Sequence, residues 1–203
     1  PDAPVRRLAR YDDICVLVPN RTDIDLYVRA LRDVGIPHLL DGGRTFFQRQ
    51  EVRELAAMLR ALDDPSDTIS LVAALRSEAF ACSDIDLLQY RVDGGRLSLG
   101  AEPVGDGPVA AAIARLRSLN EARSDHSLPS FVDLVLRESM LVESQLWAGD
   151  RQRASNLKLV VDRAGDFATS QQDALRPFVR WLSQREGQAS AEQESQVAEP
   201  DEE

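Results

Sequence analysis

Short apolar runs separated by turn residues mark the first forty positions of the chain. Residues 14–18 form a continuous apolar run closed by a Pro-Asn pair, a pattern that predicts a short strand buried in a parallel sheet. Thr22 and Asp23 can cap a following helix, which Gly35 ends, and residues 36–40 predict a second short strand. The pattern therefore predicts a strand–helix–strand unit, which is typical of α/β sheets but too small to form a whole domain.

Apolar side chains recur at helical spacing from residue 50 onward. One stripe consists of Val52, Leu55, Met58, Leu59 and Leu62. The spacing predicts helices over about residues 50–62, 69–75, 84–88, 109–123, 129–146, 150–170 and 173–186. Residues 93–108 hold five glycines and two prolines, so they predict a loop or a boundary. The expected fold class is mainly α, with a small α/β portion at the N-terminus followed by a helical bundle.

Charge is distributed unevenly along the chain. The formal net charge is −10, yet the segment beyond Arg185 holds seven acids and no base, so residues 1–185 hold 24 basic and 27 acidic groups. This near balance leaves room for a local basic face. Residues 187–203 are polar and acidic, with Val197 as their only large apolar side chain, and they predict a disordered acidic linker.

Several protein classes are disfavoured by what the sequence lacks. No apolar run approaches the roughly 20 residues that span a bilayer, and no signal peptide begins the chain, so we expect a soluble, cytoplasmic protein with no membrane partner. Cys15 and Cys82 lie in apolar surroundings and predict buried, reduced thiols. There is no phosphate loop, and His38 and His126 have no metal-ligand spacing. We therefore expect no catalytic residue, no metal site and no cofactor bound by this chain alone.

A segment with two glycines and two phenylalanines links the predicted strand–helix–strand unit to the predicted helices. Gly42 and Gly43 allow a tight turn after the second predicted strand. Phe46 and Phe47 are adjacent, so on a regular element at most one faces the core, and the other is free to stack on a nucleobase or to fill a seam between domains. The alternative is a plain strand-to-helix connection with an aromatic staple. Glu51 falls near the start of the next helix, where its charge favours the helix dipole.

Residues 14–62 resemble the region around motif IV of the UvrD, PcrA, RecB and AddA helicases of superfamily 1. Members of this family carry a G-I-P-Y turn followed by G-G-x-x-F-F-x-R-x-E-I-[KR]-[DE]. The matching positions here are Gly35, Ile36, Pro37 and His38, followed by Gly42, Gly43, Phe46, Phe47, Arg49, Glu51, Val52, Arg53 and Glu54. The resemblance implies that this segment belongs to the second RecA-like motor domain (2A) of such a helicase.

Two further stretches extend the resemblance. Residues 59–67 are similar to the L-R-x-[IL]-x-[DN]-P-x-D junction of the family, and residues 153–159 are similar to the R-x-x-N-L-x-x-L helix of the inserted accessory domain (2B). The family likeness implies three parts: a partial 2A motor domain with its junction helices over residues 1–90, a helical 2B-like domain over residues 91–186, and the acidic linker over residues 187–203.

The resemblance implies a part of an ATP-dependent DNA helicase that unwinds DNA in repair or recombination. In such proteins two RecA-like domains close on ATP and Mg²⁺, so the implied partners are DNA and the missing first motor domain of the same protein. The family arginine that reaches the nucleotide phosphates matches Pro19 here, and Arg21 is the nearby candidate for that role. We expect this chain alone to hydrolyse no ATP.

Basic side chains at seven positions are the candidates for contacts with the DNA backbone, and such contacts should weaken with salt. They are Arg44, Arg115, Arg117, Arg123, Arg151, Arg153 and Lys158. The alternative is that these side chains form solvated helix faces balanced by nearby acids. A second interpretation of the whole chain also stays open, in which a helicase-derived module binds a protein partner through its helices and does not bind DNA.

Overall fold

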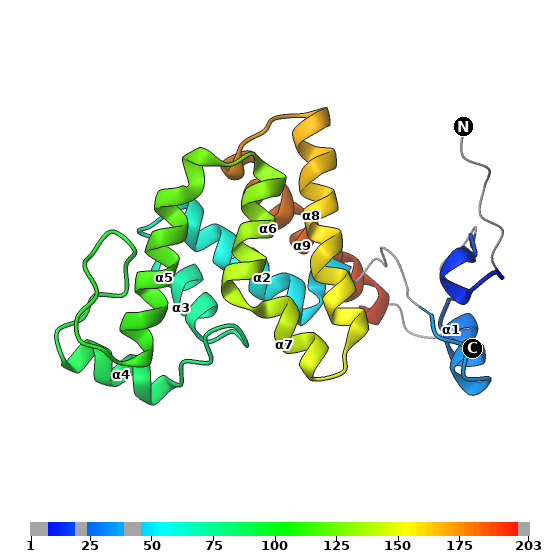
Figure 1. The fold of residues 1–203 in the computed structure, drawn as a ribbon, viewed down its shortest axis with the longest axis horizontal. Coiled ribbons are helices and arrows are strands. Elements are labelled where there is room, and N and C mark those ends of the chain that lie inside the picture. The colour runs from blue at the N-terminus through cyan, green and yellow to red at the C-terminus, as the bar shows by residue number, and fades with distance from the viewer. Residues whose placement is uncertain (1–7, 19–23, 39–45, 199–203) are drawn as a thin grey trace. The chain divides into compact units, whose positions relative to one another are not determined.

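The computed structural model describes residues 8–18, 24–38 and 46–198, and the chain divides into two compact units, Pro1–Gly43 and Arg44–Glu203. The described residues are mainly helical, which confirms the expected fold class at that level, and none of them forms a strand (Figure 1). The small α/β portion is therefore not shown. Residues 14–18 lack a neighbouring strand within the described part of the chain, and Ile14, Val16 and Leu17 are exposed rather than buried as predicted.

Unit 1, considered by itself, contains the 3₁₀ turn η1 (Tyr11–Asp13) and helix α1 (Ile24–Asp33). Gly35 ends α1 as predicted, with a φ of +69°, and Ile36 N–H donates to the carbonyl of Leu31 at 2.8 Å. Cys15 is exposed, which corrects the expectation of two buried thiols, whereas Cys82 is buried. The correction has the same cause as the exposed strand residues, because no sheet covers this run in the described residues.

Unit 2 is a bundle in which the predicted helices are present. Its elements are η2 (Phe46–Gln48), α2 (Gln50–Asp63), α3 (Thr68–Leu75), α4 (Asp84–Val92), α5 (Pro108–Ala122), η3 (Arg123–Asp125), α6 (Leu128–Ser139), α7 (Leu141–Trp147), α8 (Arg151–Ser170) and α9 (Leu175–Ala198). Figure 1 shows α5, α6 and α8 in front of α2. Within the described residues, no helix is long and apolar enough to cross a membrane.

The helix predicted over residues 129–146 is interrupted at Met140. This residue adopts the left-handed conformation, with a φ of 56°, and separates α6 from α7. A non-glycine residue in that conformation costs roughly 1 kcal/mol. The break places Leu141 in the core, where its exposed fraction is 0%, so burial of leucine offsets the local strain.

Helix α9 runs on to Ala198, which corrects the prediction that disorder begins at Gly187. The stretch after Gly187 consists largely of alanine, glutamine and glutamate and contains no proline before residue 200. These residues have high helix propensity, so a helix already anchored by its first turns can continue through a polar sequence. Low hydrophobicity alone therefore did not predict the end of the helix.

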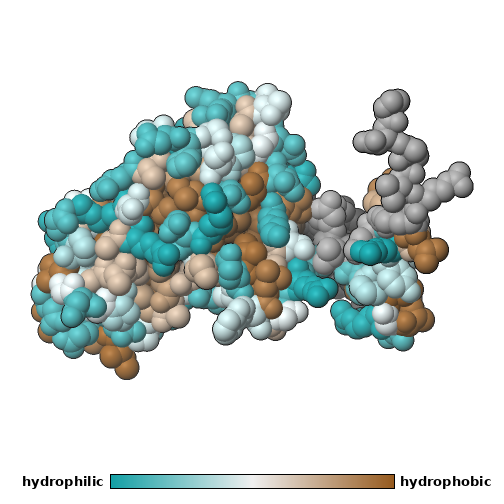
Figure 2. Space-filling view, viewed as in Figure 1, coloured by the Kyte–Doolittle hydropathy of each residue, from teal (hydrophilic) through white to brown (hydrophobic). Residues whose placement is uncertain are grey.

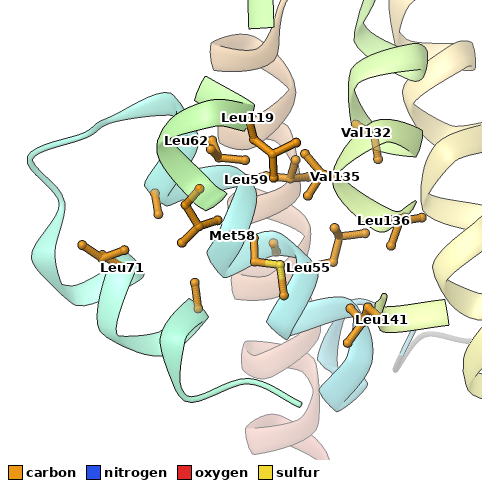
Figure 3. Packing of buried hydrophobic residues seen from close by; sticks show 14 of the residues in the cluster. Leu55, Met58, Leu59, Leu62, Leu71, Leu119, Val132, Val135, Leu136 and Leu141 are labelled. Carbon is orange, nitrogen blue, oxygen red and sulfur yellow. The ribbon is translucent and has the colours of Figure 1, made fainter. Parts of the chain in front are cut away.

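Helix α2 lies at the centre of the hydrophobic core of unit 2. It packs against α3, α5, α8 and α9. Leu55, Met58, Leu59 and Leu62 project from it and are fully buried, as the apolar stripe predicted. Figure 3 shows these side chains meeting Leu119 of α5 and Val132, Val135 and Leu136 of α6. Because neighbours on several sides cover it, α2 is the element that fixes the position of the others.

One hydrophobic cluster extends from Phe46 to Leu182 and crosses the loop over residues 93–108. The boundary between the two compact units falls after Gly43, not near residue 90. Packing thus joins the helices on both sides of that loop into one body. The assignment of residues 1–90 and 91–186 to two domains of a helicase came from the family likeness and stays a prediction.

Candidate nucleic-acid interface

Phe46 and Phe47 lie next to each other in η2. Phe46 is 2% exposed, and its ring centroid lies 5.0 Å from that of Phe47, which in turn lies 5.5 Å from the ring of Trp181. Phe46 is thus the ring that faces the core, whereas Phe47 is only partly buried and packs edge-on against Trp181 of α9. The contact with Trp181 fits the aromatic-staple alternative, and a role of Phe47 at a nucleobase stays a prediction.

Glu51 occupies the first turn of α2, as predicted, but its main partners lie on α8. Its side chain is almost fully buried, and Asn156 Nδ2 donates to Glu51 Oε1 at 2.7 Å. Arg153 Nε lies 3.7 Å from Glu51 Oε2. A buried carboxylate is costly unless it is hydrogen-bonded and neutralised, and these two side chains supply both.

Arg153 extends this polar cluster toward α7 and the turn that follows α3. It donates to Glu78 Oε1 at 2.8 Å and to Gln145 Oε1 at 3.2 Å, while Gln145 Nε2 also donates to Glu78. The hydrogen bond from Gln145 and the charge and hydrogen bond of Arg153 lower the pKa of Glu78. The hydrogen bond from Arg153 to Glu78 in turn raises the pKa of the arginine.

The cluster brings together two sequence motifs that lie about a hundred residues apart. Glu51 belongs to the F-F-x-R-x-E stretch, whereas Arg153 and Asn156 belong to the R-x-x-N-L stretch. Sequence reasoning singled out both stretches but did not predict their contact, and it missed Gln145 and Glu78. The available signal was a polar residue at an inward helix position in each motif, which requires a partner elsewhere.

The lowered pKa of Glu78 predicts an acid-dependent loss of stability. Because the folded pKa lies below the ordinary value of 4.5, the stabilisation is present above that pH and is lost as the pH falls through the lower folded value. Urea unfolding measured from neutral to acid pH should show a smaller decline for Glu78→Gln than for the unchanged chain. Identical pH profiles for the two proteins would contradict this role of Glu78.

Four of the predicted site residues lie outside the described residues. They are Arg21, Gly42, Gly43 and Arg44. Arg49 is described and forms the N-cap of α2, where its side chain makes no capping hydrogen bond. The roles assigned to these five residues stay predictions.

Four of the predicted DNA-contact arginines have partners within the protein, and three of these four side chains are partly buried. Arg117 donates to the carbonyl of Ala101 at 2.6 Å and pairs with Glu102. Arg123 reaches Asp63 at 3.2 Å, and Arg153 lies in the polar cluster. Their partners orient these guanidinium groups toward loops and helices of unit 2, so structural contacts already occupy them.

Arg151 and Lys158 remain as exposed cations on one helix. Neither side chain has an ion pair or hydrogen bond with another of the described residues, and their separation of seven positions places them on the same face of α8. Arg115 is exposed too, but it forms a surface pair with Glu138 at 3.4 Å. Figure 2 shows hydrophilic residues over much of the drawn face of unit 2. Arg151 and Lys158 are therefore the predicted DNA-contact residues whose charged groups have no partner among the described residues.

No group of three or more histidine, cysteine, aspartate or glutamate side chains in the described residues could hold a metal ion. His38 lies 2.9 Å from the carbonyl of Ile36 through Nδ1, and His126 is exposed. Neither histidine belongs to a ligand set in this part of the structure.

The mainly helical bundle brings together two motifs that resemble those of a helicase family. Residues 3–84 match the model of the UvrD-like helicase C-terminal domain. The chain is similar to an ATP-dependent helicase/nuclease subunit from Geobacillus thermodenitrificans, with 26% identity over 197 residues, covering 87% of this chain and 16% of that protein. It is also similar to the ATP-dependent DNA helicase UvrD1 of Mycobacterium leprae, with 30% identity over 188 residues, covering 81% and 23%.

UvrD1 of Mycobacterium bovis is a further relative, with 26% identity over 185 residues, covering 81% of this chain and 24% of that helicase. The family match and these relatives support a fragment of a UvrD/AddA-type superfamily 1 helicase, as the motifs indicated. It spans less than a quarter of the length of these three relatives.

Proposed function

We propose that this chain is the part of an ATP-dependent DNA helicase that contacts DNA and transmits motion from a motor domain, in a protein that unwinds DNA for repair or recombination. The names of its relatives and the match of residues 3–84 support the proposal. The structural observation that carries it is the hydrogen bond between Glu51 and Asn156, because it joins the motor-like motif to the accessory motif.

Residues 1–90 are proposed to be part of a second RecA-like motor domain with its junction helices, and residues 91–186 to be the 2B-like accessory part. The exposed run at Ile14, Val16 and Leu17 supports this, because such a run becomes stable when neighbouring strands of a parallel sheet cover it. ATP and Mg²⁺ would bind between this domain and the first motor domain, with Arg21 as the phosphate contact. No step of ATP hydrolysis is assigned to residues of this chain, which alone should be inactive.

Arg151 and Lys158 are proposed to bind DNA phosphates. Each phosphate contact replaces a counterion on the DNA, so the slope of log K against log salt changes by about 0.9 per contact. In a fluorescence anisotropy titration with a forked duplex, the unchanged chain should bind at low salt and lose affinity as salt rises. The double variant Arg151→Gln/Lys158→Gln should reduce the slope by about 2.

Arg96→Gln is the matched control, since Arg96 is an exposed arginine in the loop after α4. It should leave both the affinity and the salt slope unchanged. An affinity that does not change with salt concentration would contradict the proposed phosphate contacts. An equal loss of affinity and salt dependence in Arg96→Gln would contradict them as well. ATP hydrolysis by this chain alone would overturn its assignment to the part without the ATPase site.

The alternative function is a helicase-derived module that binds a protein. One observation favours it: Ile85, Leu88 and Val92 form an exposed aliphatic stripe along α4. The net charge of −10 also disfavours general attraction to DNA. Absence of any DNA binding at low salt would favour this alternative over the helicase role.

A further inference from the structure

Trp147 is the most exposed large apolar side chain among the described residues, at 96%. It ends α7, and the two residues that follow it, Ala148 and Gly149, provide almost no side chain to cover the indole. Gly149 has a φ of +79°, which turns the chain into α8. Leu146 and Met140 of the same segment are about half exposed. The indole is therefore open to an incoming planar group.

The exposed cations of α8 lie directly after this tryptophan. Only Ala148, Gly149 and Asp150 separate Trp147 from Arg151, and Lys158 follows two turns later, about 10 Å along the helix axis. The intervening acid is already engaged, because Asp150 accepts a hydrogen bond from Arg153 N–H at 3.0 Å and lies 3.7 Å from Arg153 Nε. Asp150 is thus held by Arg153 and not by Arg151.

We propose that Trp147, Arg151 and Lys158 form a binding platform for single-stranded DNA, in which a base stacks on the indole and the two cations contact successive parts of the backbone. An exposed aromatic ring followed by aligned cations is the arrangement that binds single strands without sequence preference. The inference rests on the proposed DNA-binding function and deepens it, since it specifies an unpaired strand at this end of α8.

The observations favour a nucleobase over a protein at this position. A protein interface needs a broad apolar surface, whereas a base needs one accessible ring face. Around Trp147 the apolar surface consists of one exposed indole and two half-exposed side chains. The adjoining face of α8 carries the exposed cations Arg151 and Lys158, with exposed Asp162 one turn beyond Lys158. The aliphatic stripe of α4 has the character of a protein contact and lies on a different helix.

The test uses the intrinsic fluorescence of the chain, which has only two tryptophans. Trp181 packs among Phe47, Phe167 and Phe178. The fluorescence typical of a solvent-exposed tryptophan should therefore come from Trp147. Titration with oligothymidine of roughly 15 nucleotides at low salt should quench this emission. In a fluorescence anisotropy titration with labelled oligothymidine, Trp147→Ala should weaken binding about 10-fold or more, whereas Trp147→Phe should retain most of the affinity.

One control variant and three possible outcomes decide between the interpretations. Ile69→Ala is the matched control, because Ile69 is 84% exposed on α3 and should leave binding unchanged. If Trp147→Ala binds oligothymidine as the unchanged chain does, the stacking site is refuted, even where forked duplex still binds through Arg151 and Lys158. If the chain binds no DNA at all, both the stacking site and the proposed DNA-binding function are refuted. Quenching that depends on protein concentration without DNA would reassign Trp147 to a protein contact.

Discussion

Phe178→Ala is expected to lower the free energy of unfolding of unit 2 by about 3–5 kcal/mol. Phe178 is fully buried on α9, its ring stacks on Trp181 with centroids 5.6 Å apart, and Phe167 of α8 contacts it at 5.5 Å. Alanine would leave a cavity between two helices that are tied to α2, and a close-packed core relaxes only partly around such a void. Urea unfolding followed by far-UV circular dichroism measures the loss.

Two matched substitutions check the cause of this effect. Phe178→Leu keeps most of the buried volume and should cost clearly less than alanine. Leu88→Ala removes a side chain that is 65% exposed and should change stability by less than about 0.5 kcal/mol. Equal losses for the alanine variants at Phe178 and Leu88 would show that the aromatic cluster does not hold α9 in place.

The second large effect is expected at Asn156. Asn156→Leu removes the hydrogen bond to buried Glu51 and leaves the carboxylate with Arg153 at 3.7 Å as its remaining partner. A buried charge that loses a hydrogen-bond donor costs about 3 kcal/mol. The free energy of unfolding should fall by that amount at neutral pH, as measured by urea titration.

The double variant Glu51→Leu/Asn156→Leu shows whether the loss of stability in Asn156→Leu comes from the unpaired charge of Glu51 or from altered packing. Apolar groups can replace both partners with little loss, so the double variant should be more stable than Asn156→Leu alone. If the two changes instead destabilise additively, the contact between Glu51 and Asn156 contributes nothing specific. That result would also remove the structural basis for joining the two motifs.

Periodicity predicted most of the helical bundle because each helix buries one regular stripe. Leu55, Met58, Leu59 and Leu62 are buried as their spacing indicated, and the capping residues Asp67 and Ser83 accept hydrogen bonds from the first turns of α3 and α4. These features depend only on neighbours within a few residues. Local sequence patterns can therefore specify them without knowledge of the tertiary structure.

The candidate site was less predictable because it depends on distant partners. The family motif singles out Arg153, but nothing local shows that this side chain is partly buried against Glu51, whereas Arg151 two positions earlier is exposed. The same holds for Phe47, whose ring packs against Trp181 from far along the chain. A strand, likewise, forms only when other strands pair with it, and residues 14–18 have no such partner among the described residues.

The ion pair and hydrogen bonds that hold α2 to α8 also bear on how force passes through the molecule. If one of these helices slid along the other, the carboxylate of Glu51 would lose its partners and remain buried. The free-energy cost of an uncompensated buried charge is much larger than the thermal energy. Helices α2 and α8 should therefore move as one rigid unit. A displacement of the N-terminus of α2 should produce a displacement of α8 of nearly the same size.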